Sequence, residues 1–159
     1  MNDKPQIKLT PDQALPKAES YCAYQERCQQ EVRDKLYEWG LWPEAVETII
    51  ARLINDKYLN EERFAKAFAG GKFRIKKWGR VKIRLELKRR KVSEYCIKQA
   101  LKEIDEKAYI QTLKKVLDDR SKKVKQRKSI RRNYMLGQYA VSKGFEADLV
   151  WDIIRETFE

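Results

Sequence analysis

Histidine is absent from the 159-residue sequence, and its absence limits the chemistry that the chain can perform. Histidine is the commonest general base in enzymes and the commonest ligand of catalytic metal ions. The three cysteines, Cys22, Cys28 and Cys96, lack a common zinc-binding spacing, so we expect them to be small buried thiols. No constellation of catalytic residues is found in the sequence. We therefore predict a protein that is not an enzyme and that needs no metal or other cofactor.

Long apolar runs and phosphate-binding loops are missing as well. No stretch approaches the roughly 18 consecutive apolar residues of a membrane span, and the first residues lack the apolar region of a signal peptide. The tripeptide GGK at residues 70–72 lacks the upstream glycine of a phosphate loop, and Phe73 stands where Ser or Thr would hold magnesium. We expect a cytoplasmic protein with no membrane partner.

Positive charge is what the sequence has in excess, and it is concentrated in two segments. The net charge of the chain is +12. Residues 72–91 contain eleven Lys or Arg residues and one acid, Glu86, whereas residues 120–132 contain eight Lys or Arg residues and no acid. Charge concentrated in this way favours a polyanionic partner over a general role in solubility. The alternative is that both segments are only solvated helix faces.

An apolar pattern occurs three times along the chain, with periods of 51 and 53 residues. It becomes visible when Gly40, Lys91 and Gly144 are placed in register. The first copy consists of Val32, Leu36, Leu41, Val46, Ile49 and Ile50, the second of Ile83, Leu87, Val92, Ile97, Ala100 and Leu101, and the third of Leu136, Ala140, Phe145, Val150, Ile153 and Ile154. The spacings within each copy indicate two helices joined by a short turn.

Each copy has room for one more helix ahead of this pair. Gly40 and Gly144 suit left-handed helix ends, and Thr10, Asn60 and Ser93 suit helix starts. We therefore predict an all-α protein, an elongated solenoid of three tandem three-helix repeats. The repeats are expected at residues 10–58, 59–107 and 108–159, after a mobile N-terminal tail at residues 1–9.

The basic segment at residues 72–91 contains a helix of the second copy. Val81, Ile83, Leu85 and Leu87 alternate with polar residues as in a strand, but the repeat predicts that they lie on a helix. On a helix, Val81 and Leu85 form one apolar pair, and Ile83 and Leu87 form another on the opposite side. We therefore expect this helix to be buried on two sides between neighbours, with its bases projecting from the rims.

Two stretches of the second copy, YLNEERFAKAF at residues 58–68 and KKWGRVKIRLELKRRKV at residues 76–92, together resemble the RecX family of bacterial regulatory proteins. The residues that carry the resemblance are Tyr58, Leu59, Glu61, Glu62, Arg63, Phe64, Gly79, Glu86 and Leu87. Looser matches in the other two copies extend it from Ala14 to Phe158. The chain departs from the family pattern at Lys91, where the family often has glycine, and at Cys28, where it often has serine.

The resemblance implies a non-enzymatic modulator of the RecA recombinase that acts in DNA repair, DNA recombination and the SOS response. Family members bind the RecA filament on single-stranded DNA, lie along its helical groove and restrain its ATPase, recombinase and coprotease activities. The resemblance therefore predicts that the partners are the RecA nucleoprotein filament and single-stranded DNA. We expect the chain to act as a monomer and to be inhibitory.

The basic residues of both segments are the predicted partner contacts. The first group is Lys72, Arg74, Lys76, Lys77, Arg80, Lys82, Arg84, Lys88, Arg89 and Lys91, and the second is Arg120, Lys122, Lys123, Lys125, Arg127, Lys128, Arg131 and Arg132. Trp78 lies among these bases, where it either stacks on a nucleotide base or packs between helices. Trp39, Trp42 and Trp151 lie on or beside the repeat and are assigned to the core.

Two other functions fit the charge pattern. A general DNA- or RNA-binding helical protein would resemble a helix-turn-helix module, with a basic helix in a nucleic-acid groove. A helix that is apolar on two sides is less free to enter a groove, which counts against this alternative. A surface for acidic membrane lipid is weaker still, because the bases are not opposed by one clean apolar face.

Overall fold

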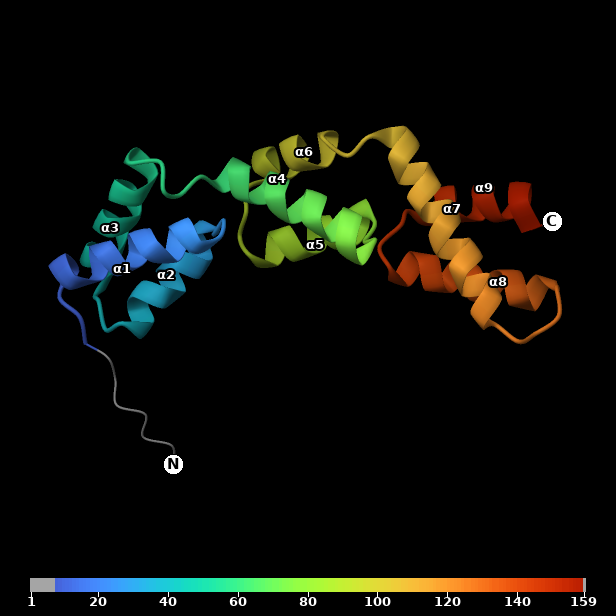
Figure 1. Ribbon diagram of the computed structural model, residues 1–159, viewed down its shortest axis with the longest axis horizontal. Coiled ribbons are helices and arrows are strands. Elements are labelled where there is room, and N and C mark those ends of the chain that lie inside the picture. The colour runs from blue at the N-terminus through green and yellow to red at the C-terminus, as the bar shows by residue number, and fades with distance from the viewer. Residues whose placement is uncertain (1–7, 159) are drawn as a thin grey trace, which may run out of the picture.

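The computed structural model describes residues 8–158, and every regular element in that range is helical. Unit 1 consists of α1 (Pro11–Tyr24), α2 (Gln29–Glu38) and α3 (Pro43–Asn55). Unit 2 consists of α4 (Glu61–Gly71), the π-helical turn η1 (Lys72–Lys76), α5 (Arg80–Arg89) and α6 (Glu94–Lys102). Unit 3 consists of α7 (Glu106–Lys123), α8 (Ile130–Ser142) and α9 (Ala147–Phe158). The units follow one another along an arch (Figure 1), which confirms the elongated all-α repeat fold.

The helices begin and end where the local sequence favours it. Side-chain oxygens cap the first turns of five helices, from Thr10, Asn60, Ser93, Asp105 and Ser129. Gly40 and Gly144 end α2 and α8 with left-handed φ angles of 85° and 99°. Lys91 occupies the same register after α5 with φ of 57°, a conformation that costs a residue with a Cβ atom but not glycine.

The predicted apolar skeleton is the core of each unit. All eighteen skeleton positions are buried, and none exposes more than 9% of its surface. Val46, Ile97 and Val150, which share one register, are each 0% exposed. The alignment of the three copies is therefore confirmed at the level of packing.

The buried side chains form two separate clusters. One cluster fills unit 1, and the other runs without interruption through units 2 and 3. Cys28 is the exception, because it belongs to unit 1 in sequence and packs in the second cluster together with Phe64. All three cysteines are buried free thiols, as predicted. Burial raises the pKa of the Cys28 thiol to about 12.

Three expectations need correction. The mobile tail does not extend to Leu9, whose amide donates to Trp39 O at 2.9 Å and whose side chain packs on unit 1; residues 1–7 of the predicted tail lie outside the described residues. Trp42 is 53% exposed, because Leu41 takes the core position beside it. On α5 only the face with Ile83 and Leu87 is buried.

The opposite face of α5 is open. Val81 is 53% exposed and Leu85 is 48% exposed, so the predicted burial of α5 on two sides is wrong. The sequence pattern correctly marked an apolar pair there, but no other helix of the described chain covers it. None of the described helices is both long and apolar enough to cross a membrane.

The two joints between units use one recurring contact. The first amide of α2, Gln29 N, donates to Glu61 Oε2 of unit 2 at 3.3 Å. The first amide of α5, Arg80 N, donates to Tyr109 Oη of unit 3 at 3.0 Å. Gln29 and Arg80 share one register in the repeat, so the first helix of each following unit caps the second helix of the unit before it.

Candidate nucleic-acid interface

The segment between η1 and α5 is held against unit 3 by backbone contacts. Gly79 N donates to Lys143 O at 2.9 Å, and Val81 N donates to Gly144 O at 2.9 Å. A Cβ atom on Gly79 would lie 2.3 Å from the carbonyl carbon of Gly144, so only glycine allows this approach. Lys77 makes the turn into Gly79 with a left-handed φ of 54°. The basic segment of unit 2 is thereby fixed beside α7 and α8.

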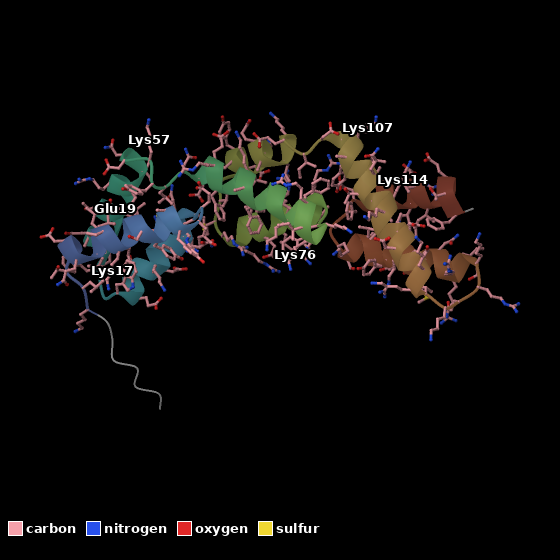
Figure 2. All side chains as sticks on the ribbon, in the orientation of Figure 1. Lys17, Glu19, Lys57, Lys76, Lys107 and Lys114 are labelled. Carbon is pink, nitrogen blue, oxygen red and sulfur yellow. The ribbon has the colours of Figure 1, made fainter. Side chains whose placement is uncertain are left out.

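This docking brings the two basic segments together in one cleft of about 260 Å³. We call it the joint cleft; it is lined by Ile75, Lys76, Lys77, Val116, Asp119, Arg120, Lys123, Tyr139 and Lys143. Four of these residues belong to the predicted contact set, two from each segment. Figure 2 shows Lys76 on the inner side of the arch, whereas Lys57 and Lys107 lie on its outer side.

The joint cleft has a strongly positive lining. It contains five cationic side chains and a single carboxylate, Asp119, which is 3.9 Å from Lys77 Nζ. The guanidinium of Arg120 lies 4.4 Å from the ring centroid of Tyr139. Among residues 8–158, no carboxylate oxygen lies within 4 Å of the amino group of Lys76 or Lys123. Such a site attracts phosphate or carboxylate groups and offers apolar and aromatic surface beside them.

Ile75 adds an exposed apolar side chain at the mouth of the joint cleft. It is 78% exposed and lies between two exposed basic side chains, Arg74 and Lys76. Bases of single-stranded nucleic acid bind to cationic grooves that also present flat or apolar surface. The arrangement therefore suits a single strand better than a duplex, whose bases are stacked inside.

Trp78 packs within unit 2. Its ring meets Phe68 edge to face at 6.4 Å, and the amino groups of Lys72 and Lys82 lie 5.0 Å and 4.5 Å from its centroid. These contacts support the packing interpretation of Trp78. Lys72 and Lys82 are correspondingly held by cation–π contacts.

Two of the predicted contact residues have structural roles. Arg80 forms ion pairs with Glu106 and Glu146 at 2.9 Å and 3.0 Å and lies over the ring of Tyr109. Arg132 is buried, and its Nη2 donates to Ser121 O at 2.7 Å, which ties the end of α7 to α8. Arg80 has two carboxylate partners and Arg132 is buried, so we no longer expect either residue to contact a partner.

The remaining predicted residues lie on the surface outside the joint cleft. Arg84 and Lys88 pair with Glu94, Arg89 with Glu86, and Lys122 with Asp118. Arg74, Lys91, Lys125, Arg127, Lys128 and Arg131 are exposed, and no carboxylate of the described chain lies within 4 Å of their charged groups. The last four border the α7–α8 connection and extend the positive surface of unit 3.

The structure adds two residues that sequence reasoning missed, Lys143 and Tyr139. Lys143 Nζ donates to Lys76 O at 2.8 Å across 67 residues of sequence, so it belongs to the joint cleft although it lies in neither basic segment. Its position before Gly144, at the helix end, was the only local signal. The described residues contain no group of three or more His, Cys, Asp or Glu side chains placed to hold a metal ion.

Comparisons with known proteins agree on one family. Residues 14–53 match the model of the first three-helix domain of RecX, and residues 60–101 match the model of the second. Among curated proteins, the regulatory protein RecX of Bacillus cytotoxicus is 24% identical over 92% of this chain and 54% of its own length. The regulatory proteins RecX of Lactobacillus johnsonii and Prosthecochloris aestuarii are 36% and 34% identical over 62% and 60% of this chain.

The chain spans 36–63% of the length of these three curated relatives. Solved structures are similar over more of their length. The crystal structure of RecX from Lactobacillus salivarius superimposes with a TM-score of 0.83 over 92% of this chain and 95% of that one, at 21% identity. A second crystal structure of a regulatory protein RecX gives a TM-score of 0.79 over 92% and 73%, at 23% identity. At these identities the structural likeness establishes the fold.

Proposed function

The chain belongs to the RecX family, and from that premise we propose that it binds the RecA–single-stranded DNA filament and restrains RecA. Its relatives carry the name regulatory protein RecX. The proposed role consists of binding alone, so it requires neither catalysis nor a cofactor. It would be exercised in the cytoplasm, by one chain on the filament, during DNA repair and recombination.

One observation carries the proposal: the two basic segments meet in the joint cleft. Lys76 and Lys77 come from unit 2 and Arg120 and Lys123 from unit 3, so the cleft joins charges from both sides of the joint. Cations that only keep the surface solvated would be expected to lie apart, because their mutual repulsion opposes gathering them in one cleft. A phosphate of the filament's DNA, or a carboxylate of the recombinase, would satisfy the cations of this cleft that no described carboxylate neutralises.

The shape of the arch supports a regulatory effect on a polymer. The joint cleft lies between units 2 and 3, and unit 1 extends away from it along the arch (Figure 1). A chain anchored at the joint can therefore contact a neighbouring filament subunit with its other units. Two linked contacts raise the effective concentration at the second site, so restraint below one chain per RecA is expected.

The test is ATP turnover by preformed RecA filaments on single-stranded DNA, titrated with this protein. We expect turnover to fall at ratios below one for the wild type. The double variant Lys76→Glu/Lys77→Glu should lose most of this effect. The double variant Lys17→Glu/Lys107→Glu makes the same charge change at two exposed residues outside the joint cleft and should retain it. Equal loss in both variants would show that only net charge matters.

General nucleic-acid binding without RecA is the second candidate. The exposed bases at the α7–α8 connection, including Lys125, Arg127 and Lys128, favour it, because they extend the positive surface away from the joint. Co-sedimentation distinguishes the two. Enrichment on RecA–DNA filaments over bare single strands at equal salt supports the first candidate, and equal binding to both supports the second. Replacing a base that binds one phosphate should lower the salt slope by about 0.7 on single strands.

A further inference from the structure

The three units differ at one surface position of the repeat, between the second and third helix of each unit. The register seven residues before the aligned Gly40, Lys91 and Gly144 holds Arg33, Arg84 and Gly137. The register seven residues after them holds Glu47, Lys98 and Trp151. The repeat predicts that these two registers face each other across the same groove in every unit.

Unit 1 and unit 3 each close this groove with their own side chains. In unit 1, Arg33 Nε pairs with Glu47 Oε1 at 2.7 Å. In unit 3, the ring of Trp151 packs on Gly137 so closely that a Cβ atom there would lie 2.3 Å from it. An ion pair in one unit and an aromatic ring in the other therefore perform the same closure.

Unit 2 lacks this closure, because both facing residues are cations and Arg84 pairs instead with Glu94 at the start of α6. Arg84 and Lys98 line an open cleft of about 520 Å³, which we call the side cleft. Its other lining residues are Arg80, Val81, Leu101, Lys102 and Glu146. Val81 and Leu101 contribute apolar surface to the side cleft. Among its cations, Arg80 is paired with Glu106 and Glu146, whereas no carboxylate of the described chain lies within 4 Å of the amino groups of Lys98 and Lys102. Two like charges cannot close the groove as Arg33 and Glu47 do.

At a second pair of registers, units 1 and 3 again make a contact of their own and unit 2 does not. Ten and six residues before the aligned positions, unit 1 has Gln30 and Asp34, hydrogen-bonded to each other at 2.8 Å. Unit 3 has Tyr134 and Gln138 there, hydrogen-bonded at 2.9 Å. Unit 2 instead has Val81 and Leu85, which are about half exposed. The apolar pair of α5 is therefore specific to unit 2 and is not part of the repeat's core.

These differences point to a partner that supplies what unit 2 lacks. We infer that the side cleft binds an acidic peptide segment of a protein partner, with a carboxylate placed between Arg84 and Lys98. An apolar side chain of the peptide packs on Val81, which lines the cleft, and on Leu85, one helical turn farther along α5 and outside the lining. The carboxylate takes the place that Glu47 holds in unit 1. The apolar anchor covers the face of α5 that the chain leaves open. Val81 and Leu85 form an aliphatic i, i+4 pair on one helix, a surface suited to an apolar peptide side chain, whereas the joint cleft offers the ring of Tyr139 to a nucleotide base; a peptide therefore fits the side cleft better.

The side cleft is distinct from the joint cleft, because the two share no lining residue. The inference therefore goes beyond the proposed binding of nucleic acid at the joint cleft. Its test needs neither RecA nor DNA, so its failure and the failure of the proposed function are separate outcomes.

The probe is a fluorescein-labelled peptide of Ala and Glu with two Leu residues four positions apart, followed by fluorescence anisotropy. The reference peptide has Gln in place of both Leu residues. We expect the wild type to bind the Leu peptide about tenfold more tightly than the reference peptide. Val81→Gln/Leu85→Gln should abolish this preference, and both changes lie at exposed positions, so the melting curve should stay close to that of the wild type.

Lys98→Glu is the sharpest variant, because it converts the unit 2 pair into the unit 1 pair. Glutamate at this position should compete with Glu94 for Arg84, place a negative charge in the side cleft and weaken binding of the Leu peptide about tenfold or more. Lys17→Glu makes the same charge change at an exposed residue of unit 1 and should weaken binding less than about twofold. Equal losses in the two variants would overturn the inference, as would equal affinity of the wild type for both peptides.

One further comparison tests the separation of the two clefts. Lys76→Glu/Lys77→Glu should leave binding of the Leu peptide unchanged, and Val81→Gln/Leu85→Gln should leave binding of a single-stranded oligonucleotide unchanged. Loss of both ligands in either double variant would mean that the chain has one extended polyanion surface and no separate peptide site.

Discussion

Gly79→Ala tests whether the approach of unit 2 to unit 3 depends on the missing side chain. The φ and ψ angles of Gly79 are −78° and 168°, an extended conformation that alanine adopts without strain. The added Cβ atom would lie 2.3 Å from Gly144 C, Gly144 O and Phe145 N. Ordinary carbon contacts are about 3.5–4.0 Å, so the two backbones must separate by about 1 Å.

The expected cost follows from the bonds that cross this contact. Gly79 N to Lys143 O and Val81 N to Gly144 O are both 2.9 Å long, and Arg80 N to Tyr109 Oη is 3.0 Å. Each hydrogen bond contributes about 0.5–1.5 kcal/mol, and overpacking costs about 1–3 kcal/mol. We expect Gly79→Ala to lower the free energy of unfolding by about 2–4 kcal/mol. For a chain of this size that is a fall in Tm of roughly 5–15 °C.

The measurement is urea and thermal unfolding followed by circular dichroism, with Gly71→Ala as the matched control. Gly71 is helical, and a Cβ atom on it would meet nothing within 4 Å. Alanine there should raise the free energy of unfolding by about 0.5–1 kcal/mol, because glycine is a poor helix former. The two glycines lie only eight residues apart, so opposite signs would isolate the joint contact.

A second readout connects the joint to function. Separating the backbones should widen the joint cleft between Lys76 and Arg120 and weaken binding to a single-stranded oligonucleotide, whereas Gly71→Ala should not change it. The reasoning is refuted if Gly79→Ala unfolds at the same urea concentration as Gly71→Ala and binds the oligonucleotide equally well.

Three further predictions concern single residues. Ile97→Asp would bury an unpaired charge at a 0% exposed position and should lower the free energy of unfolding by about 3–5 kcal/mol in urea titrations; melting like the wild type would contradict the repeat alignment. Lys91→Gly should raise the same free energy by about 1 kcal/mol, because glycine adopts a φ of 57° without steric cost; a fall in Tm would contradict this. Burial raises the pKa of the Glu61 carboxyl, so the folded state keeps this proton longer than the unfolded state, and stability falls as pH rises from about 4.3 through the raised folded pKa. Glu61→Gln should remove that part of the fall, measured as the difference between wild type and variant in urea at pH 4 and pH 7; a constant difference would refute it.

Sequence alone predicted the elements that depend on local and periodic signals. The aligned skeleton was sufficient to identify buried positions such as Ile97 and Val150, because an apolar helix face at the same register in all three copies is the face that packs into the core. Helix ends followed from chemistry that is local, as at Gly40 and Gly144. Periodicity could not say whether a neighbour covers the second apolar face of α5, because that depends on where unit 3 docks and not on α5 itself.

The joint cleft could not be predicted for the same reason. Lys76 and Lys143 are 67 residues apart in the chain, and only the approach of Gly79 to Gly144 brings them together. The charge runs therefore identified two segments but not their meeting point. Arg132 was predicted as a partner contact because it lies in a basic run, but it is buried and its guanidinium donates to Ser121 O. Counting bases cannot separate a cation that positions the backbone from one that faces a partner.

The residues that carry the family resemblance are concentrated at the joints and not in the basic clefts. Glu61 accepts from Gln29 N, and Arg63 Nε donates to Glu26 Oε1 at 2.6 Å, so both connect unit 2 to unit 1. Gly79 performs the corresponding role between units 2 and 3. Glu61, Arg63 and Gly79 therefore hold neighbouring units together, whereas the cations of the joint cleft carry the proposed binding of a polyanion. Variants at the joints should change which surfaces reach a filament at once, with little effect on the salt dependence of contacts made by a single cleft.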